Sequence, residues 1–170
     1  MENVSTGGAR EESLHRALEQ EHREIDAILE GYADGTAPGH EAEADLGRAV
    51  AELRRHIYAE EELLFPPLRQ AGMIGPVMVM LREHGQMWPI LDRLDQGLVE
   101  EVGADVLGAD CRELLALLQL HNPKEEQILY PELDRVVGAD AGADVHELLD
   151  AGHVPAGWTC QFLRAEHGRR

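Results

Sequence analysis

Apolar residues recur at alternating steps of three and four in four successive stretches of the chain, at residues 14–29, 46–63, 76–91 and 107–128. This spacing is typical of a helix that buries one stripe of its surface. A turn-rich segment at 33–39 follows the first stretch, and the pair Pro66-Pro67 is expected to end or kink the second. Pro89 and Pro123 predict kinks in the last two stretches. Four long helices with short connections predict an all-α fold, an antiparallel up-and-down four-helix bundle.

The second half of the chain repeats the first. Segment 56–68, HIYAEEELLFPPL, aligns with segment 121–133, HNPKEEQILYPEL, at an offset of 65, and six of the thirteen positions are identical. In the preceding helix of each half, a Glu-His pair at 21–22 aligns with one at 83–84 at an offset of 62. Two copies of one helical hairpin predict a bundle with pseudo-twofold symmetry.

Histidine and glutamate interrupt the apolar stripes. Each stripe carries one histidine, and the second and fourth also carry a glutamate four residues later, on the same helix face. The six residues expected in the interior are His22, His56, Glu60, His84, His121 and Glu125. A buried carboxylate without a cation is costly, and no lysine or arginine lies on these stripes at that level. Six nitrogen and oxygen donors are more than the four ligands of a tetrahedral zinc site, and they suit two metals bridged by carboxylates.

The repeat suggests how these ligands divide. The two histidines of each hairpin would hold one metal, while the two glutamates bridge the pair. Asp26 is either a fallback ligand or an acceptor for a histidine N–H. His15, one heptad before His22, either extends the site or packs at the end of the bundle. Glu61 and Glu126 lie about 100° around the helix from the bridging glutamates, which favours solvated groups or partners of the ligands. The HxxxE spacing disfavours a ferritin-type site, which uses ExxH.

The charge balance restricts the expected partners. Fifteen lysines and arginines against 33 aspartates and glutamates give a formal net charge of −18, and such a surface repels phosphate backbones and anionic lipids. The chain has no apolar run near the ~20 residues of a membrane span, and its opening residues lack the apolar core of a secretory signal. Two distant cysteines fit a reducing compartment. We therefore expect a cytoplasmic protein with no nucleic-acid or membrane partner.

The paired blocks HxxxEExLLFPxL and HxxxEExILYPxL, each with an EH pair on the preceding helix, resemble the hemerythrin family, specifically its bacterial HHE cation-binding type. The resemblance covers about residues 14–137, between a polar N-terminal segment at 1–13 and a linker with a C-terminal helical extension at 138–170. It implies an up-and-down four-helix bundle with an oxo- or hydroxo-bridged di-iron centre. By matching position it gives the six interior residues ligand roles, and manganese or zinc also accepts such ligands.

The resemblance further implies binding of dioxygen, peroxide or nitric oxide. Oxygen-carrying members have a second histidine four residues after the one on the third helix, whereas this chain has Trp88 there and Asp26 at the matching place in the first half. This departure favours peroxide chemistry over simple oxygen carriage. Three classes stay open: a binder or sensor of dioxygen and related oxidants, which we favour; a catalase-like enzyme that decomposes peroxide; and a metal-stabilised, iron-responsive interaction module whose protein partner is unspecified.

Overall fold

The computed structural model of the chain describes residues 13–36 and 39–167, and every regular element within these residues is a helix. The expected all-α class is therefore confirmed. The long helices are α1 (Leu14–Ala33), α2 (His40–Ala59), α4 (Ile74–Val99) and α5 (Ala104–Lys124). The shorter elements are η1 (Glu60–Leu64), α3 (Phe65–Gln70), η2 (Glu125–Leu129), α6 (Tyr130–Val136), α7 (Ala139–Ala151) and α8 (Gln161–His167). Of the expected N-terminal segment 1–13, residues 1–12 lie outside the described part.

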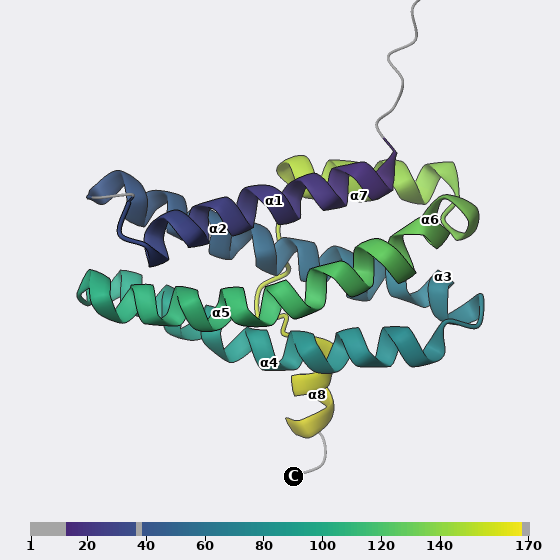
Figure 1. Cartoon of the computed structure of the whole chain (residues 1–170). Coiled ribbons are helices and arrows are strands. Elements are labelled where there is room, and N and C mark those ends of the chain that lie inside the picture. Colours follow the sequence, from purple (N-terminus) through teal and green to yellow (C-terminus); the bar gives the residue numbers. More distant parts are fainter. Residues whose placement is uncertain (1–12, 37–38, 168–170) are drawn as a thin grey trace, which may run out of the picture.

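The four long helices form a bundle. Helix α1 packs against α2 and α5, and α4 packs against the same two helices, so the four lie side by side (Figure 1). Along α1 the predicted apolar stripe is the buried face, which consists of Leu14, Leu18, His22, Ile25, Leu29 and Tyr32. The 3.6-residue period of the sequence therefore determines which face of each helix points inward.

Two π-helical turns, η1 and η2, occur at matching places in the two halves of the repeat. In each turn a backbone N–H donates to the carbonyl five residues earlier, from Phe65 to Glu60 and from Tyr130 to Glu125. Each π turn is followed by a proline in the first turn of the next helix, where a missing N–H costs little. The helix expected to end or kink at Pro66-Pro67 therefore continues through α3 after a wider turn.

The apolar core is divided into two clusters. One, which includes Leu29, Leu46 and Leu91, fills the end of the bundle at the α1–α2 connection. The other, which includes Leu18 and Leu133, fills the opposite end. Since His22 lies between Leu18 and Ile25 on α1, the layer of buried histidines separates the two clusters.

The C-terminal region contains more helix than the sequence suggests. Helix α7 begins at Ala139, so the residues expected as a linker form its first turns, and the helix covers α1 and α2. Alanine is the best helix former, and Val145 and Leu149 bury the inner face of α7 in the second apolar cluster. Helix α8 packs against α4 on another flank of the bundle (Figure 1).

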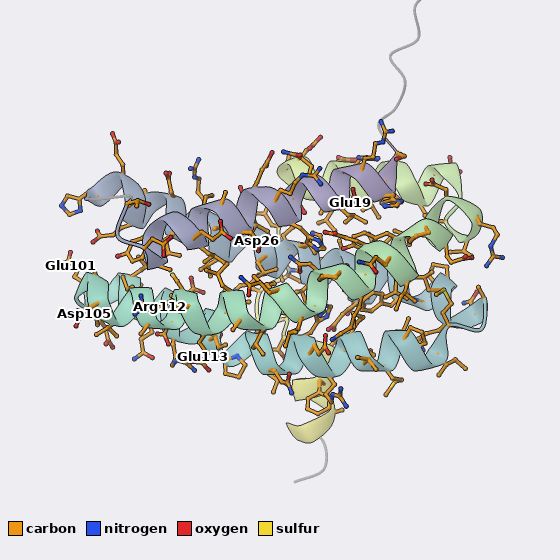
Figure 2. All side chains as sticks on the ribbon, viewed as in Figure 1. Glu19, Asp26, Glu101, Asp105, Arg112 and Glu113 are labelled. Carbon is orange, nitrogen blue, oxygen red and sulfur yellow. The ribbon has the colours of Figure 1, made fainter. Side chains whose placement is uncertain are left out.

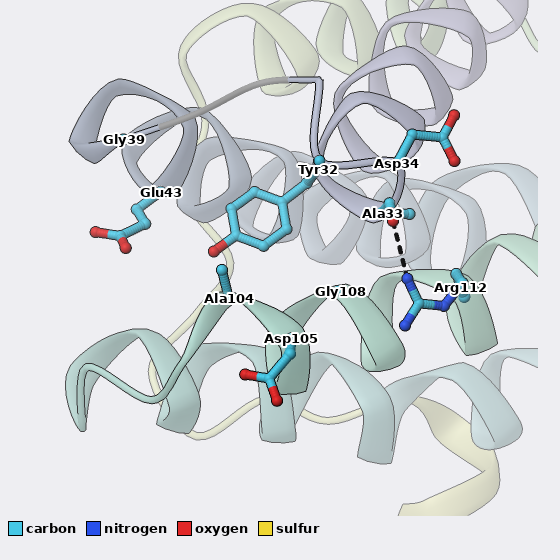
Figure 3. A pocket seen from close by; sticks show the side chains of 10 residues that line it. Tyr32, Ala33, Asp34, Gly39, Glu43, Ala104, Asp105, Gly108 and Arg112 are labelled. Atoms are coloured by element: carbon cyan, nitrogen blue, oxygen red, sulfur yellow. Dashed lines mark hydrogen bonds between the residues drawn. The ribbon is translucent and has the colours of Figure 1, made fainter.

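Charged side chains such as Glu101 and Glu113 project from the outside of the bundle (Figure 2). At the C-terminal end of α1, Arg112 of α5 donates an Nη1 hydrogen bond of 2.8 Å to the Ala33 carbonyl, beside a pocket lined by Tyr32 and Asp105 (Figure 3). This bond satisfies one of the carbonyls that every helix end leaves unpaired. Among the described helices, none combines the length and apolar character needed to span a membrane.

Both cysteine thiols should be unreactive in the folded protein. Cys111 and Cys160 are free and fully buried, and burial together with the neighbouring Asp110 raises the pKa of the Cys111 thiol to about 12. Burial also raises the pKa of Cys160. Because the thiolate is the reactive form, we expect a thiol-specific reagent such as Ellman's reagent to label neither cysteine at neutral pH and both in guanidinium chloride. Rapid labelling of either thiol in the native protein would contradict this packing.

Candidate metal centre

Four buried imidazoles meet at the centre of the bundle, one from each long helix. His22 of α1 and His56 of α2 have ring centroids 4.7 Å apart. His84 of α4 and His121 of α5 form the second pair, with centroids 5.0 Å apart. All four are buried among the apolar side chains of the bundle, so each long helix contributes one imidazole to a common layer.

The two glutamates of the repeat lie between the histidine pairs. Glu60 and Glu125 are fully buried and are the first residues of the two π turns. The Glu60 carboxylate lies 3.4 Å from His56 Nε2 and 3.3 Å from His84 Nε2. The Glu125 carboxylate lies 3.0 Å from His121 Nε2 and 3.5 Å from His22 Nε2. Glu125 also lies 3.8 Å from His84 Nε2, so each carboxylate contacts imidazoles from both halves of the repeat.

The potential ligand atoms fall into two overlapping groups. Each residue of a group offers one donor atom, and the donor atoms of a group all lie within 4.8 Å of one another. One group consists of Glu60, His84, His121 and Glu125, and the other of His22, His56 and Glu125. The structure therefore brings all six sequence-predicted residues together, with Glu125 common to both groups.

Each imidazole also contacts one further carboxylate through its other ring nitrogen. The Nδ1 to carboxylate distances are 2.9 Å for His22 and Glu126, 2.7 Å for His56 and Glu21, 2.9 Å for His84 and Glu61, and 2.9 Å for His121 and Glu83. An Nδ1–H that donates to a carboxylate leaves Nε2 as the lone-pair nitrogen, which is the usual support for a metal-binding histidine. Sequence reasoning left the role of Glu61 and Glu126 open and assigned none to Glu21 and Glu83, although all four repeat between the halves.

Tyr130 is a member of the site that the sequence analysis missed. Its hydroxyl donates a 2.7 Å hydrogen bond to Glu60 and lies 3.0 Å from His56 Nε2 and 3.1 Å from His22 Nε2. Burial and the two nearby carboxylates raise its pKa well above the ordinary value of 10.0, so the phenol keeps its proton. The available signal was a mismatch in the repeat, because Tyr130 aligns with Phe65, whose ring stacks on His84 with centroids 5.7 Å apart.

The buried carboxylates and imidazoles of the layer shift each other's pKa. Burial and the neighbouring Glu125 raise the pKa of Glu60, but the His56 and His84 imidazoles outweigh them and lower it to about 2. Burial lowers the pKa of His56, yet the carboxylates of Glu60 and Glu21 raise it to about 10. In the described part of the chain, the ion pairs of Glu60 and Glu125 all involve histidine and none involves lysine or arginine.

Three buried atoms in the layer, Glu60 Oε2, Glu125 Oε1 and His84 Nε2, make no well-directed hydrogen bond and instead lie 3.0–3.8 Å from one another or from His121 Nε2. All three carry lone pairs that can ligate a metal, and unpaired buried polar atoms are costly. Their donor chemistry, two carboxylate oxygens and an imidazole nitrogen, is that of a first-row transition-metal site. The residues present therefore fit a metal ion at this position.

The two possible additions to the site, Asp26 and His15, lie outside both donor groups, as does Trp88. Asp26 accepts a 3.3 Å hydrogen bond from Asn122, and Figure 2 shows it on α1. His15 bonds to Glu19 at 2.7 Å and packs edge-on against the Tyr130 ring, at the end of the layer. Trp88 is buried, with the Arg54 guanidinium 4.5 Å above its ring.

Comparisons with known proteins point to one family. The family model described as "Hemerythrin HHE cation binding domain" matches residues 13–133. Similar curated proteins include the "Iron-sulfur cluster repair protein YtfE" of Yersinia pestis (strain Pestoides F) and of Yersinia pseudotuberculosis serotype O:1b (strain IP 31758). Each is 33% identical over 99 residues, covering 52% of this chain and 44% of the relative, so the match spans less than half of each relative's length. No solved structure matches the chain significantly.

Removal of the Tyr130 hydroxyl should destabilise the metal-free protein. Tyr130→Phe deletes the buried donor that bonds to the Glu60 carboxylate, and loss of a hydrogen bond to a charged group costs about 1.5–3 kcal/mol. We expect a decrease of this size in the free energy of unfolding, measured by urea denaturation. Tyr58→Phe is the matched control, because the described structure gives the Tyr58 hydroxyl no hydrogen bond and uses only its ring, against Trp158. Equal stabilities of the two variants would remove Tyr130 from this network.

Proposed function

Because the chain belongs to the hemerythrin HHE cation binding domain family, as its repeated blocks predicted, we propose that it is a non-haem di-iron protein that binds dioxygen or a related small oxidant. The proposed ligands are His22, His56, Glu60, His84, His121 and Glu125, in an up-and-down four-helix bundle. The two histidine pairs would each hold one ion, and the two glutamates would bridge them. Manganese and zinc also accept this donor set.

The observation that carries the proposal is the pair of buried carboxylates that have only imidazoles around them. Glu60 and Glu125 contact all four histidines and, in the described structure, no lysine or arginine. Without metal, the protonated imidazoles compensate these carboxylates, as the raised pKa of His56 indicates. An imidazole that binds a metal through Nε2 is neutral, so in the loaded protein the metal ions would take over that compensation. A bound pair of iron ions would supply electrons to, and coordination positions for, a small oxidant such as dioxygen, peroxide or nitric oxide.

The surrounding residues prepare the site for such a ligand. The outer carboxylates orient the four imidazoles through Nδ1, which fixes Nε2 toward the centre. Tyr130 keeps a proton on its hydroxyl and directs it at Glu60. The apolar clusters at both ends of the layer exclude bulk water, which strengthens every electrostatic interaction inside it.

A second candidate function comes from the relatives, which are named as iron–sulfur cluster repair proteins. A site that holds iron with histidine and carboxylate ligands could serve as an iron source for such repair. The match covers 44% of the length of those relatives. Cluster repair is therefore proposed only as a second candidate function of this chain. Peroxide decomposition is a third candidate function, and an iron-responsive interaction module is a fourth. We expect each of them to operate in the cytoplasm.

The first test is the metal content of the purified protein. We expect about two irons per chain, with oxo-bridge absorption bands that bleach on anaerobic reduction. His84→Ala removes a buried nitrogen that has no hydrogen-bond partner, and should lower the affinity for iron by about 10-fold or more. His40→Ala is the control, because His40 is fully exposed and pairs with Glu43 on the surface of α2. A wild-type chain without iron, manganese or zinc, or a His84→Ala chain with full metal content, would refute the proposed site.

The second test separates the candidate functions in the iron-loaded protein. Binding of dioxygen or nitric oxide predicts an absorption change on exposure to the gas that reverses when the gas is removed. A peroxide-decomposing enzyme predicts sustained oxygen evolution from hydrogen peroxide, absent in His84→Ala. Cluster repair predicts that the protein restores the absorption of a damaged iron–sulfur protein under anaerobic conditions. If none of these responses occurs and a chelator lowers the melting temperature, the metal has the structural role of the interaction module.

A further inference from the structure

The C-terminal strap, defined here as residues 158–164, crosses the bundle next to one half of the metal centre. Its Cys160 is fully buried, and its Phe162 ring lies over α4 at Gly85, where a Cβ would come within 2.5 Å of the ring. Trp158 donates a 2.8 Å hydrogen bond to Glu62, and so does Arg164. The strap is therefore packed and hydrogen bonded onto the bundle at the level of η1.

The strap is linked to the metal centre through one carboxylate. The backbone N–H of Gln161 donates a 2.6 Å hydrogen bond to Glu61 Oε2. The other oxygen of the same carboxylate, Oε1, accepts a 2.9 Å hydrogen bond from His84 Nδ1. A short chain of two hydrogen bonds thus joins the strap backbone to a proposed metal ligand.

The other half of the repeat has no such link among the described residues. Glu126 is the equivalent of Glu61 and bonds to His22 Nδ1 at 2.9 Å. Its side chain is 30% exposed, whereas that of Glu61 is 1% exposed. Only Glu61 is bonded to the strap, so the carboxylate partners of His84 and His22 differ in exposure and in hydrogen bonding.

Trp88 also takes part in this arrangement. Trp88, one turn after His84, packs edge-on against Trp158 of the strap, with ring centroids 5.3 Å apart. Trp158 also receives the Arg164 guanidinium at 5.0 Å from its ring. Trp88 therefore supplies a docking surface for the C-terminal strap.

We propose that Glu61 is a positioning residue through which the Gln161 N–H of the C-terminal strap holds His84, so that the strap sets the metal affinity of the His84 half of the centre. The inference rests on the proposed metal site and goes beyond it by giving residues 158–164 a role. A carboxylate clamped on both oxygens keeps the imidazole in one orientation, and such partners change metal affinity by about 10–100-fold.

The test removes the backbone N–H of Gln161, which donates the hydrogen bond to Glu61. Gln161→Pro deletes the N–H that reaches Glu61, at the first residue of α8, where proline is well tolerated. Gln161→Ala is the matched control, because it keeps that N–H. In anaerobic titrations of the full chain with iron(II) against a competing chelator, we expect Gln161→Pro to weaken one of two binding steps by about 10-fold, and Gln161→Ala to match wild type.

Double variants assign the effect to Glu61. In a Glu61→Gln background the Gln161→Pro effect should largely disappear, because the single amide oxygen can no longer serve both partners. In a Glu126→Gln background the same substitution should keep its full effect, since Glu126 belongs to the other half. Emission from Trp88 and Trp158, the only two tryptophans of the chain, reports whether the strap stays docked. A strap that is released should weaken the same step.

The outcomes separate this inference from the proposed function. A wild-type chain that binds no iron overturns both. Equal iron affinities of wild type and Gln161→Pro at both steps, whether or not the tryptophan emission changes, overturn only the role of the strap. An effect of Gln161→Pro that persists undiminished in Glu61→Gln also overturns it, because the link would then not run through Glu61.

Discussion

Two carboxylates buried at the centre of a helical bundle, Glu60 and Glu125, are the constraint on which the rest of this structure depends. Neither forms an ion pair with a lysine or an arginine within the described residues, and each contacts imidazoles from both halves of the repeat. Buried charges of this kind are tolerated only when cations or hydrogen-bond donors surround them. The four histidines, their outer carboxylate partners and the proposed metal ions all follow from that requirement.

The outer carboxylates also connect the helices to one another. Glu21 of α1 reaches His56 of α2, and Glu83 of α4 reaches His121 of α5, so each hairpin is joined internally. Between the hairpins, Glu61 reaches His84, and Glu126 reaches His22. These four contacts form a closed circuit around the bundle in which every long helix, counted together with any π turn that continues it, is bonded to two others. Metal binding and helix packing are therefore coupled, because the same imidazoles belong to the metal layer and to the circuit.

Much of this could be predicted from the sequence, because helical periodicity and the repeat are local signals. The stripe of α1 and the six inward residues needed only a period of 3.6 and the two repeat offsets of 62 and 65. The π turns were not predictable in this way, because a single turn with hydrogen bonds five residues apart leaves no periodic signal in the sequence. Glu61 lies about 100° around the helix from Glu60, yet its carboxylate accepts a 2.9 Å hydrogen bond from His84 Nδ1. Glu126, after the matching π turn, reaches His22 at the same distance.

Long-range contacts set the second limit of sequence reasoning. Residues of the strap lie about a hundred positions from Glu61 and Glu62, and no periodicity connects them. Their contacts break the pseudo-twofold symmetry at the same level where Phe65 replaces Tyr130 and Trp88 replaces Asp26. One half of the layer thus has a phenol and a partly exposed outer carboxylate, and the other has a stacked phenyl ring and a sealed one. The chain retains twofold symmetry in its proposed ligands and loses it in their surroundings. Any two ions held there would therefore experience different polarity and different access to water. A small oxidant would in turn meet two inequivalent positions.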